Sequence, residues 1–304
     1  MSDFVNTVDI VGDEALTASI LDGSVTEFHS DEITSLGIYA LYNCSALTSA
    51  DCPAVTIIGT NAIRGTGLAY VSFSALQDIP ESMLNGVGSL KNAYFAAAKT
   101  IGKDAFRRCS ALETIYAPEV TTIGADAFSS CSALQELVFL NALSMGTYAF
   151  SGCNSAMRIV LPKLTSVPAG AFDYCTKATS VDLPSAETIE QNAFRSCAAL
   201  TMLDLPKATN IVYSAFLSAS KLGTLILRNT EAICSLGGTN AFSGTPISST
   251  KGYIYVPRVF LSDTDETLDY RRATNWSSFA TQFRALEDYT VDGTTTGALD
   301  PTKI

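Results

Sequence analysis

The chain repeats itself every 22 residues, and this period constrains its fold more than any other feature. An Ala-Phe pair recurs at constant spacing through the middle of the chain, and its phenylalanines are Phe106, Phe128, Phe150, Phe172, Phe194 and Phe216. Looser copies precede this run at Leu41, Ile63 and Leu84, and another follows at Phe242. A unit this short cannot bury its own apolar face, so the copies must stack into a solenoid with one continuous core.

Each unit contains one pattern typical of a strand and one typical of a helix. Leu203 and Leu205 alternate with outward positions, which predicts a half-buried strand, and Pro206 ends it because proline donates no backbone hydrogen bond. Apolar residues within 189–197 fall at helical intervals and predict one or two helical turns. We therefore expect an α/β fold: a right-handed β-α superhelix of about ten repeats with a parallel sheet on one face.

Two spacing patterns, L-x-x-L-x-L-P and I-x-x-x-A-F-x-x-C, make the repeat similar to the BspA-like class of leucine-rich repeats of bacteria and protists. The resemblance covers residues 33–257, and residues 253–257 with 270–279 resemble the C-terminal cap of many such proteins. It implies a leucine-rich-repeat solenoid that is displayed on the cell surface or secreted. It also implies adhesion to a host matrix protein, a glycan or another cell-surface protein.

The two ends of a solenoid need caps, because terminal units otherwise expose apolar core. We predict an N-terminal cap over 1–32, the solenoid over 33–257, a helical C-terminal cap over 258–289 and a loose tail over 290–304. The helical cap is predicted from apolar residues at helix-like intervals, namely Leu268, Ala273, Trp276, Phe279, Phe283 and Leu286.

Composition argues against several classes of function. Nineteen Lys and Arg against thirty Asp and Glu give a net charge of −11, so we expect neither nucleic acid nor an anionic membrane surface as a partner. One histidine, His29, in the whole chain nearly excludes Ser-His-Asp and Cys-His catalysis and sites in which several histidines bind a metal. We expect no signal peptide, no membrane-inserted segment, no cofactor and no enzymatic activity.

The cysteines are the first candidates for chemistry, because most of them share one repeat column. That column contains Cys44, Cys109, Cys131, Cys153, Cys175 and Cys197. It also accepts Thr66, Val87 and Ala219, as a small packing position would, so we expect buried free thiols. Disulfides between neighbouring repeats stay open as an alternative, since stacked columns lie close together.

Two acidic segments are weaker candidates for a metal site. Residues 263–269 are rich in Asp but lack the glycine and the final glutamate of an EF-hand loop, so ordinary acids at a helix start are expected. His29 has acidic neighbours, and we expect a surface residue there. No Cys-x-x-Cys pair or Cys-His combination indicates a metal, and none is predicted.

The outward positions of the predicted strands are the best candidates for ligand contact. They form one predicted stripe along the solenoid: Tyr70, Tyr94, Tyr116, Val138, Val160, Asp182 and Asp204. An exposed aromatic and aliphatic patch beside acids has the character of a binding surface. The alternative is that strand propensity alone places Tyr and Val on solvated strands.

These observations predict a non-enzymatic binding or adhesion module that recognises a protein or glycan through its strand face. The alternative is a structural spacer in a surface layer or a phage-like particle, with its contacts at the caps or edges. The pattern indicates no particular oligomeric state.

Overall fold

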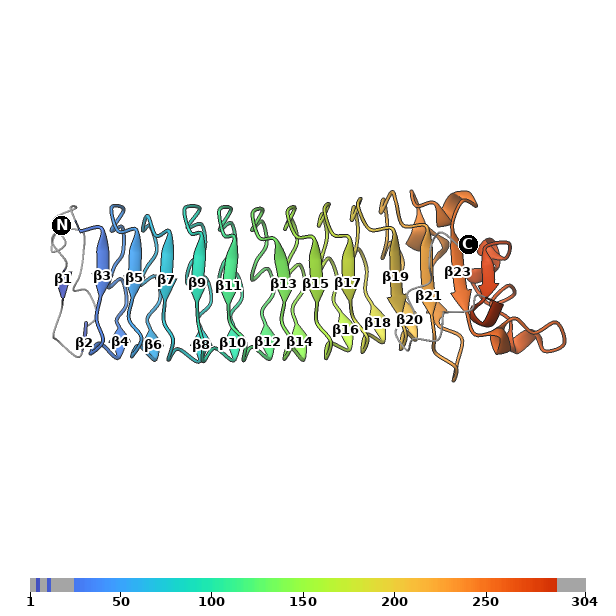
Figure 1. Ribbon diagram of the computed structural model, residues 1–304, viewed down its shortest axis with the longest axis horizontal. Coiled ribbons are helices and arrows are strands. Elements are labelled where there is room, and N and C mark those ends of the chain that lie inside the picture. The colour runs from blue at the N-terminus through green and yellow to red at the C-terminus, as the bar shows by residue number, and fades with distance from the viewer. Residues whose placement is uncertain (1–3, 6–9, 12–24, 289–304) are drawn as a thin grey trace.

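The computed structural model describes residues 4–5, 10–11 and 25–288 (Figure 1). In these residues the chain winds into a row of coils, one per repeat, stacked along the longest axis of the molecule. Each typical coil contains two short strands, and each strand pairs in parallel with its counterpart in the next coil. Two ladders of strands therefore run along the stack, here named the long-strand ladder and the short-strand ladder.

The long-strand ladder contains β1 (Phe4–Val5), β3 (Glu27–His29), β5 (Ser49–Asp51), β7 (Tyr70–Ser72), β9 (Asn92–Tyr94), β11 (Thr114–Tyr116), β13 (Glu136–Val138), β15 (Arg158–Val160), β17 (Ser180–Asp182), β19 (Met202–Leu205), β21 (Thr224–Leu227), β23 (Tyr253–Val256) and β24 (Phe283–Ala285). The short-strand ladder contains β2 (Ile10–Val11), β4 (Ser35–Leu36), β6 (Ile57–Ile58), β8 (Asp78–Ile79), β10 (Thr100–Ile101), β12 (Thr122–Ile123), β14 (Ser144–Met145), β16 (Ser166–Val167), β18 (Thr188–Ile189), β20 (Asn210–Ile211) and β22 (Ser235–Leu236). The 3₁₀-helices are η1 (Thr239–Phe242), η2 (Ile247–Ser249), η3 (Arg258–Phe260), η4 (Glu266–Leu268), η5 (Trp276–Phe279) and η6 (Leu286–Asp288).

The helical part of the predicted fold is wrong, because the Ala-Phe segments form turns and residues 25–288 contain no α-helix. Asp104 and Arg108 have φ angles of 56° and 61°, in the left-handed region that an α-helix cannot contain. Between them, the amide of Phe106 donates to the carbonyl of Ala127 in the next coil, whereas the amide of Arg107 closes a turn on Asp104. Alternate amides thus bond between coils and within a coil.

The prediction of a sheet on one face is also incomplete, because the short-strand ladder forms a second one. Its strands are Thr-Ile pairs and their equivalents, such as Thr100 opposite Thr122 and Ile101 opposite Ile123. β-branched residues favour extended backbone, and the isoleucines of these pairs are buried. The column that was predicted as the start of a helix therefore forms a strand.

Two prolines interrupt the short-strand ladder. In other coils the residue after the short strand donates its amide to the preceding coil, as Gly102 does to the carbonyl of Ile79. Pro80 and Pro168 occupy this position and have no amide hydrogen to donate. The described ladder is divided at these two points, between β6 and β8 and between β14 and β16.

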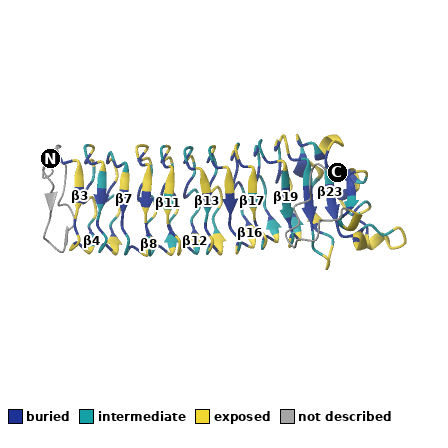
Figure 2. Cartoon of the chain, in the orientation of Figure 1, coloured by how far each residue is buried: buried dark blue, intermediate teal, exposed yellow. Residues whose placement is uncertain are grey.

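Stacked phenylalanine rings form the centre of the core. The rings from Phe106 to Phe242 lie one per coil, with neighbouring centroids 5.0–5.9 Å apart and planes within 26° of each other. All of these rings are fully buried. Figure 2 shows the resulting alternation, with buried and exposed positions recurring at the same place in successive coils. The repeat column recognised in the sequence is thus one continuous aromatic stack.

The C-terminal end closes this stack without the predicted helical cap. The ring of Phe242 meets those of Trp276 and Phe279, at 5.9 and 5.4 Å between centroids. The residues predicted at helix-like intervals lie in or beside η4, η5, β24 and η6. β24 pairs in parallel with β23, so strand pairing continues into this segment. Short 3₁₀-turns connect these parts, since a longer helix would not leave β24 free to pair.

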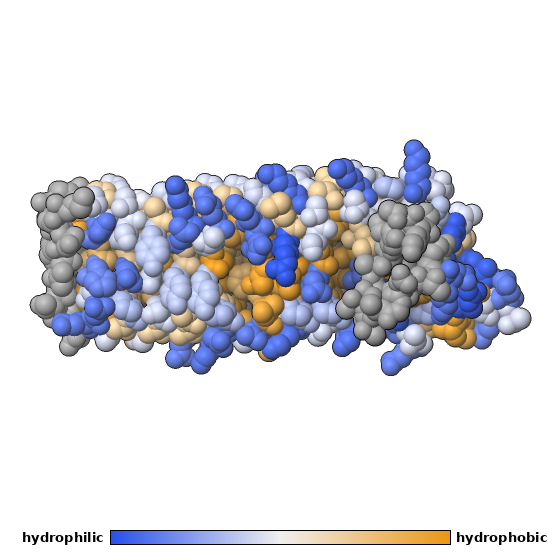
Figure 3. All heavy atoms as spheres, viewed as in Figure 1, coloured by the Kyte–Doolittle hydropathy of each residue, from blue (hydrophilic) through white to orange (hydrophobic). Residues whose placement is uncertain are grey.

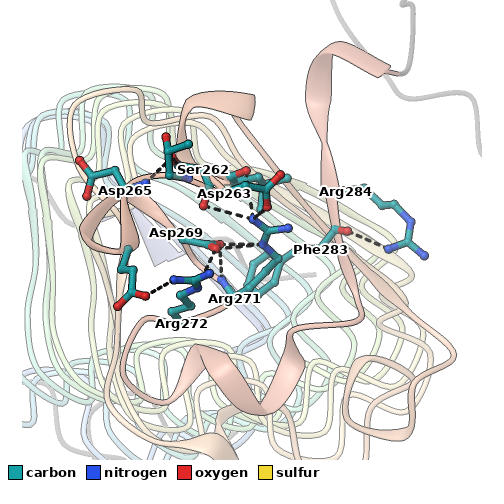
Figure 4. Close-up of polar contacts among 11 residues, drawn as sticks. Ser262, Asp263, Asp265, Asp269, Arg271, Arg272, Phe283 and Arg284 are labelled. Carbon is teal, nitrogen blue, oxygen red and sulfur yellow. Dashed lines mark hydrogen bonds and ion pairs between the residues drawn. The ribbon is translucent and has the colours of Figure 1, made fainter.

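An ion-pair network holds the loop before η5 in place (Figure 4). Asp269 is buried, and it accepts hydrogen bonds from the backbone amide and the Nε of Arg271 at 2.9 and 2.8 Å. Arg271 also reaches Asp263 at 2.7 Å, and Arg272 pairs with Glu266. Burial opposes charge on Asp269, but the hydrogen bonds from Arg271 outweigh it and lower the pKa of this carboxyl.

At the N-terminal end, β1 and β2 pair with β3 and β4. Most of the predicted cap over 1–32, and the predicted tail over 290–304, lie outside the described residues.

The aromatic stack makes a direct prediction for stability. Removal of the Phe150 ring leaves a cavity between Phe128 and Phe172, so Phe150→Ala is expected to cost about 3–5 kcal/mol of unfolding free energy in urea denaturation. Leu143→Ala is the control, because Leu143 is 58% exposed and its truncation is expected to cost less than about 0.5 kcal/mol. Equal stability of both variants would show that the column is not core.

Candidate functional site

The outward side of the long-strand ladder, here called the strand face, carries most of the predicted stripe in one column. Tyr94 lies opposite Tyr116, and Val138 lies opposite Val160, which in turn lies opposite Asp182. The inward residues between these positions belong to the core. One face of the sheet therefore brings aromatic, aliphatic and acidic side chains into a line, as the alternation predicted.

The two tyrosines of this column are stacked on each other. Their ring centroids lie 4.8 Å apart and their planes differ by 8°. This distance equals the spacing of paired strands, so the backbone register alone holds the rings in contact. Tyr94 and Tyr116 nevertheless remain 38% and 51% exposed. They form a preorganised aromatic surface whose side chains lose little freedom when a ligand binds.

Tyr70 is on the strand face but not in this column. It lies opposite Asn92, and Ser72 lies opposite Tyr94. The unit before β7 is one residue shorter, so Ser49 pairs with Tyr70 at a separation of 21 residues. Tyr70 consequently falls at the first outward position of its strand, whereas Tyr94 occupies the second. The prediction that Tyr70 continues the same stripe is therefore wrong. Tyr70 lies diagonally across from Tyr94, on the neighbouring strand.

The C-terminal part of the predicted stripe is less available. Val138 is half-buried, Val160 is buried and Asp182 is exposed. The carboxylate of Asp204 accepts hydrogen bonds from the Nε of Arg228 at 2.9 and 3.1 Å. Burial raises the pKa of Asp204, and the arginine opposes this shift. This acid is thus engaged within the chain.

Beyond Asp204 the chain covers its own strand face. Ile226 and Tyr255 occupy the next outward positions, and both are fully buried. They form a small second cluster with Met202, Tyr253 and Leu286, the last of which comes from η6. The accessible part of the stripe therefore runs from Tyr94 to Asp182.

A shallow hollow interrupts the strand face next to the tyrosines. No pairing joins β11 to β13 among the described strands, and a hollow of about 330 Å³ lies there, lined by Ile115, Gln135, Glu136 and Val138 among others. Ile115 points inward but is only half-buried. In the space-filling view, hydrophobic residues gather over β11 to β17 (Figure 3). The hollow was not predicted, although Ala117 stands where adjacent coils have Phe95 and Phe139.

The cysteine column is a packing feature. All eight cysteines are free and buried, so the structure contains the thiol form of the two alternatives. In five successive coils the thiol donates to a carbonyl of an earlier coil, as Cys131 does to Phe106 at 3.0 Å. Burial raises the pKa of Cys109 and of Cys153 from 9.0 to about 12. Such thiols are poor nucleophiles at neutral pH.

The acidic candidates for metal binding have partners within the chain. Asp263 and Asp269 bind Arg271, and Asp265 accepts a hydrogen bond from the amide of Thr267 at the start of η4. His29 lies 3.4 Å from Asp31 and 3.5 Å from Asp51. Nowhere in the described part of the chain do three His, Cys, Asp or Glu side chains converge as a metal site would require.

Two parallel ladders, a repeat of 22 residues and a stacked column of apolar rings define a solenoid of the leucine-rich-repeat class. The family model for the BspA type leucine-rich repeat region matches residues 22–135 and 143–254 in six copies. The chain belongs to this family. No curated protein matches it.

Several solved structures are similar to this chain. A leucine-rich repeat protein from Bacteroides ovatus is 20% identical with a TM-score of 0.50, over 86% of this chain and 84% of the other. A leucine-rich cell surface protein from Faecalibacterium prausnitzii is 17% identical with a TM-score of 0.40, over 81% of each chain. A leucine-rich repeat protein from T. pallidum is 22% identical with a TM-score of 0.40, over 56% of this chain and 72% of the other. The first of these similarities supports the fold alone.

Within residues 25–288, no helix has the length and apolar character that crossing a bilayer requires.

The buried thiols predict a loss of stability at alkaline pH. Their folded pKa of about 12 exceeds the unfolded value of 9.0, so the unfolded state loses protons first and stability falls as pH rises from 9 towards 12. In Cys109→Ala/Cys153→Ala this fall is expected to be shallower by up to about 1.4 kcal/mol per pH unit for each thiol.

Urea midpoints of both proteins at pH 8, 9, 10 and 11 measure this difference. Alanine occurs naturally in this column at Ala219, so the variant keeps the packing pattern of the coil. Parallel pH profiles would show that the thiols do not titrate differently on unfolding.

Proposed function

We propose that this protein is a non-enzymatic binding module that recognises a protein or a glycan through its strand face. The observation that carries the proposal is the exposed stack of Tyr94 and Tyr116, beside a shallow hollow that reaches Val138. Preorganised aromatic side chains are typical anchors of binding surfaces, because they bury much area at a small entropic cost. The exposed Asp182 continues the same line past Val160, which is buried.

Family membership supports a location on the cell surface or outside the cell, with adhesion as the biological role. The partner would be a host matrix protein, a glycan or another cell-surface protein. The reactive side chains of the described residues also favour binding over catalysis. The cysteines are buried, and the carboxylates near Arg228 and Arg271 are held in ion pairs.

The stacked core also favours a second candidate, a structural spacer. The unbroken ring stack from Phe106 to Phe242 couples coil to coil and makes a stiff rod. A rod suits a surface layer or a phage-like particle, in which the ends rather than the strand face make contacts.

Substitution of the two stacked tyrosines on the strand face distinguishes a binding module from a spacer. For Tyr94→Ser/Tyr116→Ser we expect at least about a tenfold loss of affinity for any ligand found on a panel of purified matrix proteins and a glycan array. Surface plasmon resonance measures the loss, and circular dichroism checks the fold.

Tyr148→Ser/Tyr213→Ser is the matched control. These tyrosines are 38% and 45% exposed, and they lie in the turn segments after β14 and β20. A ligand lost in both variants, or kept in the strand-face variant, would move the site away from the strand face. A protein that binds nothing on either panel would favour the spacer.

A further inference from the structure

A second and larger hollow lies away from the strand face, between the coil that contains β6 and the coil that contains β8, which are here called the second and third coils. Its volume is about 600 Å³, and its polar lining includes Arg64, Arg108, Asn61, Asn85 and Glu81. These residues come from three successive coils. A space of this size is typical of sites for small ligands.

The hollow exists because the two coils are not joined on this side. Pro80 divides the short-strand ladder here, as described above. In the third coil the turn segment bonds to the next coil, because the amides of Ser82 and Gly86 donate to the carbonyls of Lys103 and Arg107. The equivalent amides of Asn61 and Gly65 make no backbone hydrogen bond to any described residue. Neither amide has a hydrogen-bond partner among the described residues, and Asn61 lines the hollow.

The third coil also contributes little bulk. Gly86 stands where the next coil has Arg108, one repeat of 22 residues later. A Cβ atom added at Gly86 would meet no heavy atom within 4 Å. Arg64 and Arg108 come from neighbouring columns of coils two apart, about 9–10 Å along the stack at twice the strand spacing, and both line the hollow.

The charge of the hollow differs from that of the protein. The chain has a net charge of −11, yet Arg64 and Arg108 make no ion pair or side-chain hydrogen bond with residues 25–288. The nearby Arg107 is different, because it pairs with Asp104 at 3.2 Å. This arrangement suits an oxyanion. The guanidinium groups of Arg64 and Arg108 have no carboxylate partner among the described residues, and the nearby amide of Asn61 has no acceptor there.

We propose that this hollow binds an acidic saccharide. Arg64, Arg108 and the amide of Asn61 would hold its carboxylate or sulfate group. The carboxylate of Glu81 would accept hydrogen bonds from its hydroxyl groups, and the side-chain amide of Asn85 would donate to them or accept from them. Glu81 favours this ligand over an acidic peptide, because its carboxylate accepts hydrogen bonds from the hydroxyl groups that a saccharide has and polyglutamate lacks. The site is independent of the strand face.

Isothermal titration calorimetry with four probes tests the proposal. The probes are a heparin-derived hexasaccharide, hexagalacturonate, uncharged maltohexaose and hexaglutamate. We expect binding of at least one acidic hexasaccharide and at least tenfold weaker binding of maltohexaose and hexaglutamate. The first two probes distinguish a sulfate from a carboxylate. Binding of neither would overturn the proposal, and equal binding of hexaglutamate would assign the hollow to an acidic peptide.

Variants then place the bound saccharide. Arg64→Gln/Arg108→Gln is expected to weaken binding at least tenfold, and Arg64→Lys/Arg108→Lys less, because lysine keeps the charge but loses the bidentate fork. Lys177→Gln/Lys221→Gln removes the same charge from exposed sites in other coils and is expected to bind within twofold of the parent. An equal loss of affinity in Arg64→Gln/Arg108→Gln and in Lys177→Gln/Lys221→Gln would show that binding depends only on net charge, which would contradict a site in the hollow.

Tyr94→Ser/Tyr116→Ser keeps this test separate from the proposed function of the strand face. Full binding of the acidic saccharide by this variant is expected. If Tyr94→Ser/Tyr116→Ser loses binding and Arg64→Gln/Arg108→Gln keeps it, the proposal for the hollow is wrong and the saccharide binds on the strand face.

Discussion

The fold depends on one constraint: every coil must return its backbone to a position one strand spacing away from the coil before it. Parallel strand pairing meets this constraint on two sides, and bridging amides such as that of Phe106 meet it on the turn side. Because the backbone repeats at that distance, identical side chains must stack on each other. The buried phenylalanines and the exposed pair of Tyr94 and Tyr116 are products of the same register.

The large features of this structure could be predicted from the sequence because they are periodic. The phenylalanine column, the cysteine packing position and the outward residues of the strands follow from a single alignment of the repeat. The helical turns were predicted wrongly, although a second signal was present. Two residues before and two after the Phe position, the chain prefers Asn, Asp, Ser and Gly, as at Asn192 and Ser196, and these residues tolerate the left-handed backbone that the turns require.

Deviations from the period were harder to predict, because an average over repeats hides them. The shorter unit before β7 moves Tyr70 out of its expected column. Pro80 and Pro168 could have been recognised as ladder breaks, since each stands where a bonded amide is needed. The break between β11 and β13 has a weaker signal, in the small Ala117 between coils with phenylalanine. The coverage of Ile226 by Leu286 depends on tertiary contacts that no local pattern contains.

These deviations matter for function because a uniform solenoid offers the same surface at every coil. A ligand that contacts only repeated features could bind in many registers with similar energy, and such binding would have little specificity. Two breaks in the ladders of this protein coincide with hollows, one beside Tyr116 and one between Arg64 and Arg108. Each combines a gap in the backbone pairing with a departure from its column, Ala117 between coils with phenylalanine at one and Arg108 after Gly86 at the other. We therefore expect specific recognition where the repeat is interrupted, and the regular coils supply the rigidity that holds such places open.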